Sequence, residues 1–193
     1  CINYENRTKI DWKKQERNFF EIIEKLQNQG LWDCIVPVSG GKDSTYQVIK
    51  VKNLGLNPLC VNATTCDLSN IGRNNLDNIK KLGVDMIEVS GDPEVRSKLN
   101  YIGLKEVGDI SWPEHVSIFT IPFIIAAKFN IKLIIWGENS QNEYGGPKGE
   151  ENNIYLTRRW MEEFSGMSGL RVSDMHEIYK IPNMEIRRTK DIY

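Results

Sequence analysis

The fold is decided by residues 34–44, which read CIVPVSGGKDS. Cys34 to Val38 form a short apolar run, typical of a strand that is buried on both faces of a parallel sheet. Pro37 indicates that this strand ends in a special backbone geometry. A glycine-rich turn follows, and a helical pattern then runs from Thr45 to Leu54. Strand, turn and helix in this order predict a βα unit of an α/β fold.

The same alternation extends in both directions from this unit. Further strands are predicted at residues 58–62, 85–89 and 133–136, and further helices at residues 8–29, 74–82, 94–107, 113–129 and 157–164. The polar, glycine-rich residues 140–153 are predicted to form a long loop. We therefore expect an α/β fold with a Rossmann-like parallel sheet and helices on both faces. Residues 1–30 are expected to be an N-terminal helical segment, and residues 31–193 the main domain with a C-terminal helical tail.

Composition and charge count against several classes of protein. The 193 residues carry 25 Lys and Arg against 26 Asp and Glu, a net charge of -1. Bulk charge therefore offers no basic field of the kind that sequence-independent nucleic-acid binding usually needs, although a local basic patch stays open. The longest apolar run, Ile118 to Ala127, is broken by Thr120 and Pro122 and is too short for a membrane span. The cysteines at positions 1, 34, 60 and 66 form no CxxC pair, which favours a reduced, cytoplasmic compartment.

Ser39 to Ser44 is the segment that carries chemistry. Gly40 and Gly41 let backbone N–H groups approach an anion, and the following helix directs its unpaired amides and positive end to the same place. Ser39 and Ser44 add hydroxyl donors, and Lys42 adds a cation. These residues predict a cradle for phosphate or pyrophosphate.

Asp43 is the unusual member of this cradle. A carboxylate beside a phosphate is repulsive unless a cation lies between them, which points to Mg²⁺ as part of the bound ligand. The segment is not a Walker A loop, because Lys42 precedes Asp43 and no glycine stands five residues before Gly41. It is not a GxGxxG dinucleotide turn either.

At these residues the chain resembles the PP-loop ATP pyrophosphatase superfamily, whose signature is SGGxDS after the first strand of a Rossmann-like sheet. The resemblance implies that the loop binds ATP and Mg²⁺, with Lys42 and Asp43 as catalytic residues and Asp43 as a metal ligand. It also implies cleavage of ATP between its α and β phosphates. A substrate oxygen is adenylated, pyrophosphate leaves, and a nitrogen or sulfur nucleophile displaces AMP.

Longer blocks between Asp33 and Asp174 are similar to the N-acetyl sugar amidotransferase family; they include GLNPLCV, WPEHVSIFTIPFIIAAKF, LIIWGEN and LTRRWMEEF. This resemblance implies an N-acetyl sugar of bacterial surface-glycan or lipopolysaccharide biosynthesis as substrate. Its acetamido group would become an acetamidino group, with ammonia supplied by a separate glutaminase subunit.

The family pattern also implies a cysteine-rich module before the first helix. Cys1 would be its last remnant, and a structural Zn²⁺ site would lie in the missing part. The cysteines that the family carries around its Trp-Pro pair are absent here, where Ser111 precedes Trp112, so no metal or redox role is carried over for them.

The carboxyl ends of the strands supply further candidates, because ligands of open α/β sheets bind there. Gly137 and Glu138 follow the fourth predicted strand. We assign Gly137 to the ATP site and Glu138 to catalysis and to Mg²⁺, with a solvated loop carboxylate as the alternative for Glu138. Asn62 ends the second predicted strand, where superfamily members hold adenine through backbone groups; a simple turn residue is the alternative.

Five residues are candidate contacts to the substrate. His115 could touch the sugar or shuttle a proton, and a structural histidine is the alternative. A pair of arginines could clamp phosphates or a carboxylate, and a solvated helix face is the alternative. The full set of candidate substrate contacts is Trp112, His115, Asn139, Arg158 and Arg159.

Two other functions remain open at this point. One is a tRNA- or nucleobase-thiolating enzyme, or another amidating enzyme, of the same superfamily. The other is a nucleotide-binding module without catalysis. Near-neutral charge and the missing cysteine pair count against tRNA, and the intact SGGKDS segment counts against a loss of catalysis.

Overall fold

The computed structural model describes residues 11–64, 68–137, 163 and 167–181. Along the chain these residues form α2 (Trp12–Leu26), β1 (Cys34–Pro37), α3 (Lys42–Asn53), β2 (Pro58–Thr64), α4 (Asn70–Lys80), β3 (Asp85–Ser90), α5 (Pro93–Val107), α6 (Trp112–Phe129) and α9 (Val172–Glu177). The loop predicted at residues 140–153 lies outside the described residues, as does nearly all of the helix predicted at residues 157–164.

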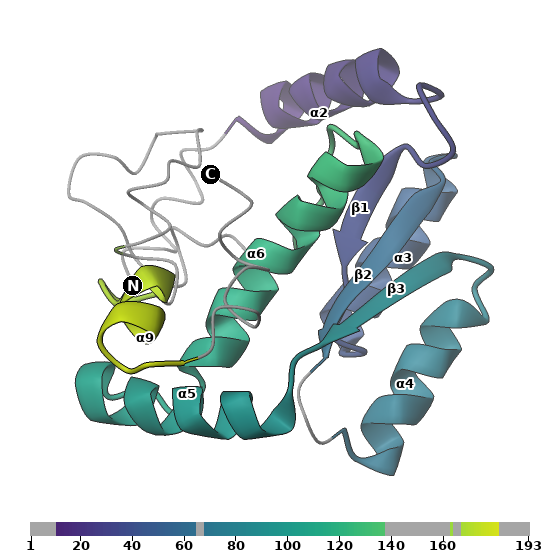
Figure 1. Ribbon diagram of the computed structural model, residues 1–193. Coiled ribbons are helices and arrows are strands. Elements are labelled where there is room, and N and C mark those ends of the chain that lie inside the picture. The colour runs from purple at the N-terminus through teal and green to yellow at the C-terminus, as the bar shows by residue number, and fades with distance from the viewer. Residues whose placement is uncertain (1–10, 65–67, 138–162, 164–166, 182–193) are drawn as a thin grey trace.

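The three strands form one parallel sheet in the order β1-β2-β3. Cys34 lies opposite Pro58, and Leu59 lies opposite Asp85. Helix α6 crosses the face of the sheet opposite to that of α3 and α4, as Figure 1 shows. The expected α/β class, a parallel sheet with helices on both faces, is therefore confirmed.

Alternation along the strands gives each face of the sheet its own core. Cys34, Val36 and Cys60 point to the side of α3 and α4, whereas Ile35, Leu59 and Val61 point to the side of α6. Because successive residues are buried on opposite sides, β1 and β2 read as continuous apolar runs in the sequence. The core on the α3 and α4 side consists of Ile23, Cys34, Val36, Val38, Val48, Val51, Leu56, Cys60, Leu76 and Ile79.

The fourth buried strand predicted at residues 133–136 needs correction. This segment is half-buried and joins β1 through a single parallel bridge between Ile35 and Ile134. The N–H of Ile35 donates to the oxygen of Leu133, and the N–H of Ile135 donates to the oxygen of Ile35, each at 2.8 Å. The next ladder bond on this edge would need an N–H at Pro37, which proline lacks. Pro37 therefore ends the ladder after one bridge.

The position of this segment makes β1 the turning point of the sheet. From β1 the chain moves outward through β2 to β3, and it returns by way of α5 and α6 to the opposite edge of β1. In open α/β sheets the crevice beyond the carboxyl ends of the strands, at such a reversal of strand order, is where ligands bind. Residues 38–41 occupy this end of β1.

Two predicted boundaries differ from the observed ones close to this crevice. Helix α3 begins at Lys42, three residues before the predicted start, because the glycine-rich turn needs only residues 38–41 to reverse the chain. Strand β2 extends to Thr64, so Asn62 lies inside the strand and does not end it. As a result, only residues 38–41 connect β1 to α3, and β2 continues beside this loop as far as Thr64.

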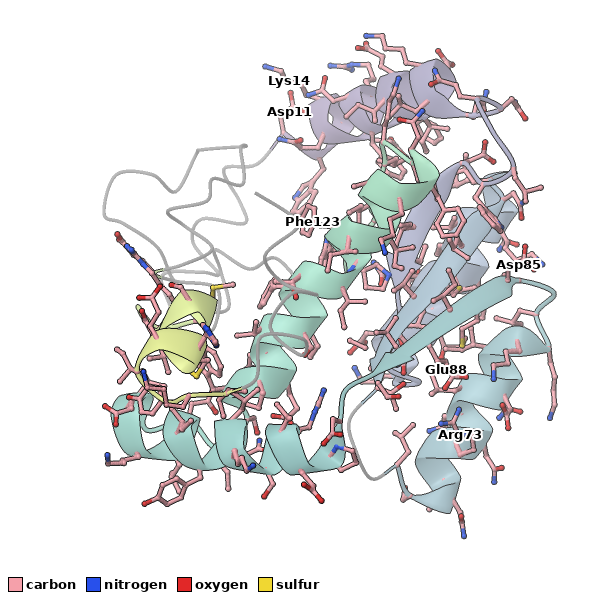
Figure 2. The ribbon with its side chains drawn as sticks, in the orientation of Figure 1. Asp11, Lys14, Arg73, Asp85, Glu88 and Phe123 are labelled. Carbon is pink, nitrogen blue, oxygen red and sulfur yellow. The ribbon has the colours of Figure 1, made fainter. Side chains whose placement is uncertain are left out.

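The outer strand β3 is tied to α4 through charged side chains. Glu88 of β3 lies 2.5 Å from a guanidinium nitrogen of Arg73 and 2.8 Å from the ammonium nitrogen of Lys80. Figure 2 shows Arg73 and Glu88 turned toward one another. Hydrogen bonds from Lys80 and Arg73 lower the pKa of Glu88, so these contacts persist to a lower pH than an ordinary glutamate would allow.

Among the described residues, no single helix is both long enough and apolar enough to cross a bilayer. Helices α5 and α6 taken together have the length and composition of a membrane span, although they meet at a bend of 110°.

The two buried cysteines should be chemically silent in the native protein. Burial raises the pKa of Cys34 and of Cys60 to about 12, so both thiols stay protonated far above neutral pH. We expect neither to react with iodoacetamide at pH 8.5, and both to react after unfolding in guanidinium, as measured by mass spectrometry of the peptides. Thiols in the unfolded chain ionise at about pH 8.5. The stability that comes from burying Cys34 and Cys60 is therefore complete below that pH, and it falls as the pH rises toward about 12. Native alkylation of either cysteine at the unfolded rate would contradict this packing.

Candidate functional site

Gly40 gives the loop between β1 and α3 its shape. Its φ is +83°, in the left-handed region that side chains disfavour. A Cβ at this position would also lie 3.3 Å from the Cβ of Asn75 and 3.4 Å from the side chain of Leu76, both on α4. The loop backbone therefore passes so close to α4 that glycine is required here on two grounds.

The start of α3 is left open toward the crevice. Gly41 is the N-cap residue, and no side chain caps the helix. Its carbonyl accepts the N–H of Thr45 at 3.1 Å and the hydroxyl of Thr45 at 2.9 Å, which begins the helical ladder. The N–H groups of the first turn, at Lys42, Asp43 and Ser44, precede that ladder. Together with the helix dipole they form an anion-binding end.

The two serines of the segment brace the loop from within. The Ser44 hydroxyl donates to the Gly41 carbonyl at 3.2 Å and accepts the N–H of Ser39 at 3.4 Å. Ser39 Oγ accepts the N–H of Gly41 at 3.3 Å. Ser44 is buried and Ser39 is exposed. Of the two predicted hydroxyl donors, Ser39 is thus the one at the surface, whereas Ser44 holds the turn.

Lys42 and Asp43 lie at the surface and pair with one another. The Lys42 ammonium nitrogen is 2.6 Å and 2.8 Å from the two carboxylate oxygens of Asp43. Their side chains are 87% and 75% exposed. An ion pair in water contributes little to stability, so either group can exchange its partner for a phosphate oxygen or a cation at little cost.

Asn62 is engaged within the protein. Its side chain is buried; Nδ2 donates to the Val38 carbonyl at 2.6 Å, and Oδ1 accepts the hydroxyl of Thr64 at 2.7 Å. The expected contact to adenine concerns backbone groups at Asn62 and stays a prediction, whereas its side chain is engaged by Val38 and Thr64. It connects β2 to the exit of β1.

Gly137 is brought close to the loop by its contact with α3. A Cβ at Gly137 would lie 2.7 Å from Oε1 of Gln47 in the second turn of α3, so only glycine fits without movement of Gln47. Gly137 thus lies beside the helix that begins in the loop, although the two are nearly a hundred positions apart in the sequence. Glu138, the next residue, lies outside the described residues.

Trp112 proves to be a core residue, which corrects its assignment as a substrate contact. It is only 2% exposed, and its indole N–H donates to the Met167 carbonyl at 2.9 Å. It packs in a cluster formed by α5, α6 and the segment around α9, where the ring has almost no surface to offer a ligand.

His115 is held by a carboxylate that the sequence analysis missed. Its Nδ1 lies 2.7 Å from Oδ2 of Asp109, and Oδ1 of Asp109 accepts the N–H of Ser111 at 2.8 Å. Both side chains are partly exposed at the start of α6. This pairing fixes the orientation of the imidazole ring, which suits proton transfer and a structural cap equally.

Several predicted residues cannot be placed. Glu138, Asn139, Arg158, Arg159, Cys1 and Cys66 lie outside the described residues. Within residues 11–64, 68–137, 163 and 167–181 there is no group of three or more His, Cys, Asp and Glu side chains arranged to hold a metal ion. The expected zinc module concerns residues that are not described.

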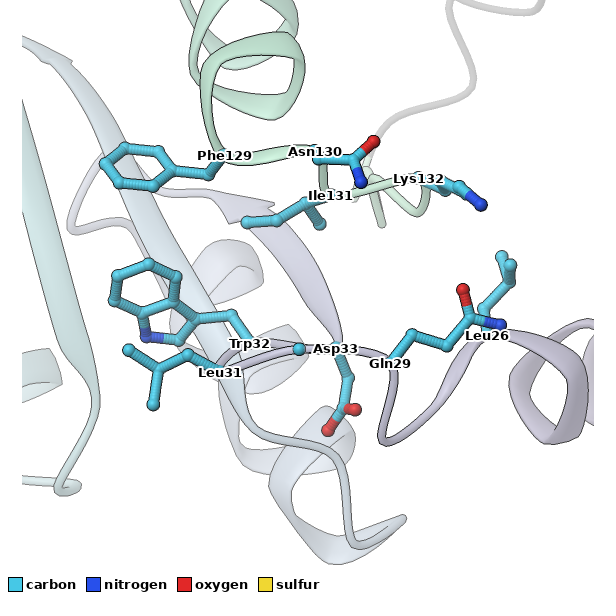
Figure 3. Close-up of a pocket in the computed structure, with 10 residues that line it drawn as sticks. Leu26, Gln29, Leu31, Trp32, Asp33, Phe129, Asn130, Ile131 and Lys132 are labelled. Atoms are coloured by element: carbon cyan, nitrogen blue, oxygen red, sulfur yellow. The ribbon is translucent and has the colours of Figure 1, made fainter.

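A depression lies at the amino end of β1, at the end of the sheet opposite the loop (Figure 3). It has a volume of about 240 Å³ and lies between the segment before β1 and the end of α6. Trp32 and Phe129 meet edge to face across it, with ring centroids 5.3 Å apart. Both carboxylate oxygens of Asp33 already accept backbone N–H groups, from Asn28 and Asn57. The length of β1 separates this depression from the loop.

Comparisons with known proteins give low similarities. No family model matches the chain, and no curated protein matches it. A predicted subunit of tRNA methyltransferase from Methanocaldococcus jannaschii is 17% identical, with a TM-score of 0.41; the match covers 67% of this chain and 59% of that one. The NH3-dependent NAD synthetase from Campylobacter jejuni is 15% identical, with a TM-score of 0.48 and coverage of 94% and 93%. The chain thus spans about three fifths of the first of these proteins.

The loop offers backbone donors and a cation to an anion such as a phosphate group. Its open helix start and its exposed cation at Lys42 supply donors of the kind that phosphate oxygens need. Mg²⁺ is commonly held by one or two carboxylates together with substrate phosphates, and Asp43 supplies one such carboxylate.

Substitution of Gly40 tests the loop geometry. Gly40→Ala should lower the free energy of unfolding by about 1 kcal/mol for the left-handed conformation, and further for the contact with Asn75. Gly55→Ala is the matched control, because Gly55 has a φ of +80° with no atom within 4 Å of its Cβ position. Urea unfolding should therefore show a larger loss for Gly40→Ala. Equal losses would contradict the close packing of the loop on α4.

Proposed function

We propose that this protein is an ATP pyrophosphatase-type enzyme of the PP-loop superfamily, which binds ATP and Mg²⁺ at Ser39 to Ser44. The observation that carries the proposal is the open start of α3 behind a left-handed Gly40, at the carboxyl end of β1 where strand order reverses. This arrangement presents backbone N–H groups to an anion at the position where α/β sheets bind ligands.

In this proposal the groups of the loop have different roles in binding ATP and Mg²⁺. The backbone N–H groups of residues 40–44 bind and orient the β and γ phosphates. Lys42 releases Asp43 and pairs with a phosphate oxygen, which frees the Asp43 carboxylate to face Mg²⁺. Neutralisation of the departing pyrophosphate then supplies much of the rate enhancement.

We further propose that the substrate is an N-acetyl sugar and the product its acetamidino derivative. The acetamido oxygen attacks the α phosphorus of ATP, and the bond to the β-phosphate oxygen breaks, so that pyrophosphate leaves. Ammonia from a glutaminase subunit adds to the activated carbon, and AMP departs with the former amide oxygen. The support for this finer assignment is the similarity of the sequence blocks between Asp33 and Asp174 to N-acetyl sugar amidotransferases.

Thiolation of a nucleobase is disfavoured for the described cysteines. Cys34 and Cys60 are completely buried, and burial raises the pKa of each thiol to about 12. A sulfur-transferring cysteine needs an accessible thiolate. Neither Cys34 nor Cys60 meets that need.

Release of pyrophosphate and AMP tests the proposal. The protein is incubated with ATP, Mg²⁺, ammonium and a panel of N-acetyl sugars, with tRNA as a separate arm. Asp43→Asn should lower pyrophosphate release at least about 100-fold, because the metal-facing charge is lost. Asp77→Asn is the matched control, since Asp77 forms a comparable exposed pair with Lys80 on α4. It should leave the rate unchanged.

Mass spectrometry of the sugar separates the finer claims. Amidination makes the product about 1 Da lighter, because NH replaces an oxygen atom. Pyrophosphate release that depends on tRNA and not on sugar would overturn the sugar assignment alone. An Asp43→Asn protein with wild-type release, or a wild-type protein without release in any arm, would overturn the assignment of the loop.

A further inference from the structure

Asn62 is a buried polar side chain that bonds directly to the backbone at the exit of β1. The N–H of Val38, one residue past β1, still donates to the Val61 carbonyl at 2.9 Å, as a parallel ladder requires. The Val38 carbonyl is instead bound by a side chain, Asn62 Nδ2, at 2.6 Å. The main-chain ladder between β1 and β2 thus gives way to a side-chain contact where the loop begins.

The amide of Asn62 has a defined orientation. A carbonyl oxygen can accept only from the NH₂ group of an asparagine, and the Thr64 hydroxyl then donates to Oδ1 on the other side at 2.7 Å. An aspartate would set a carboxylate oxygen against the Val38 carbonyl. A leucine of similar size would leave that carbonyl without this donor. Only an amide side chain of this length satisfies both neighbours.

Because the peptide group is rigid, the bond from Asn62 to the Val38 carbonyl also affects the orientation of the next backbone N–H, in the loop. The Val38 carbonyl and the Ser39 N–H belong to one planar peptide unit, so a donor that fixes the carbonyl also fixes the direction of the N–H. That N–H points to Ser44 Oγ at 3.4 Å, and Ser44 in turn donates to the Gly41 carbonyl. Asn62 therefore stands at the start of a chain of bonds that ends at the N-cap of α3.

We propose that Asn62 is a positioning residue, which orients the Val38–Ser39 peptide plane and so prepares the loop to bind the pyrophosphate part of ATP. This inference rests on the proposed function and adds a residue that acts on the ligand only through the loop. It differs from a contact to adenine, because the amide is turned toward the Val38 carbonyl and the Thr64 hydroxyl.

Binding of magnesium pyrophosphate, measured by calorimetry, tests the role of Asn62. Asn62→Asp and Asn62→Leu should weaken binding about tenfold or more, because the loop must be reordered when the ligand binds. Thr64→Val removes only the bond that orients the amide, and it should weaken binding less. If an Asn62 variant does not fold, Thr64→Val still tests whether the orientation of the Asn62 amide affects binding.

The matched control is Asn57→Ala. Asn57 also donates from Nδ2 to a backbone carbonyl, that of Leu31 at 2.7 Å, at the amino edge of the same sheet. Its loss should lower the melting temperature without changing the affinity for pyrophosphate. Asn62 variants should change both, and their loop amides at residues 39–44 should exchange with deuterium faster than those of Asn57→Ala.

The possible failures can be distinguished. Folded Asn62→Asp and Asn62→Leu proteins that bind magnesium pyrophosphate with wild-type affinity would overturn the positioning role alone. A wild-type protein that does not bind magnesium pyrophosphate or ATP would overturn the proposed function and this role together.

Discussion

The reversal of the chain at Gly40 is the constraint on which the site depends. Within four residues the backbone must leave β1, turn and start α3, which packs on one face of the sheet that it has just left. A left-handed residue achieves this turn, and a Cβ at Gly40 would crowd the side chains of Asn75 and Leu76 on α4. The same geometry points the first-turn amides of α3 into the crevice beyond β1.

Pro37 and Asn62 act on the two edges of β1 with complementary results. Pro37 lacks the N–H that would extend pairing toward residues 133–136, so that edge parts after a single bridge. On the other edge, pairing with β2 continues to Val38 and ends in the side-chain bond from Asn62. The end of β1 therefore has no further ladder bond toward residues 133–136, whereas on the other side it is bonded to β2. Such an arrangement suits a rigid loop beside an open ligand site.

Much of the fold could be predicted because burial on both faces leaves a clear mark in sequence. The runs that contain Cys34 to Val38 and Pro58 to Val61 have few polar residues, and each is followed by helical periodicity. The segment 133–136 carries the same mark, yet it forms only one bridge. The cause lies a hundred residues away, in the missing N–H of Pro37, and a local pattern cannot reveal it.

The site was predictable to the extent that its chemistry is local. Gly40, Gly41, Lys42 and Asp43 are consecutive, and their order alone predicts a phosphate cradle. Trp112 was predicted to contact the substrate, whereas its indole N–H donates to the carbonyl of Met167, fifty-five residues further along the chain. Asp109 gave no signal of its own, and the position of Asn62 did not reveal its bond to the Val38 carbonyl, since both contacts follow from side-chain direction and not from spacing.

The central claim is that the loop at Ser39 to Ser44 binds the polyphosphate of ATP. The most direct measurement is a titration of ¹⁵N-labelled protein with ATP and Mg²⁺, followed by amide chemical shifts. The account predicts that the largest changes fall on the N–H groups of Gly40, Gly41, Lys42, Asp43 and Ser44. Changes concentrated at Trp32, Phe129 and Asn130 around the opposite depression, with the loop amides unmoved, would contradict it.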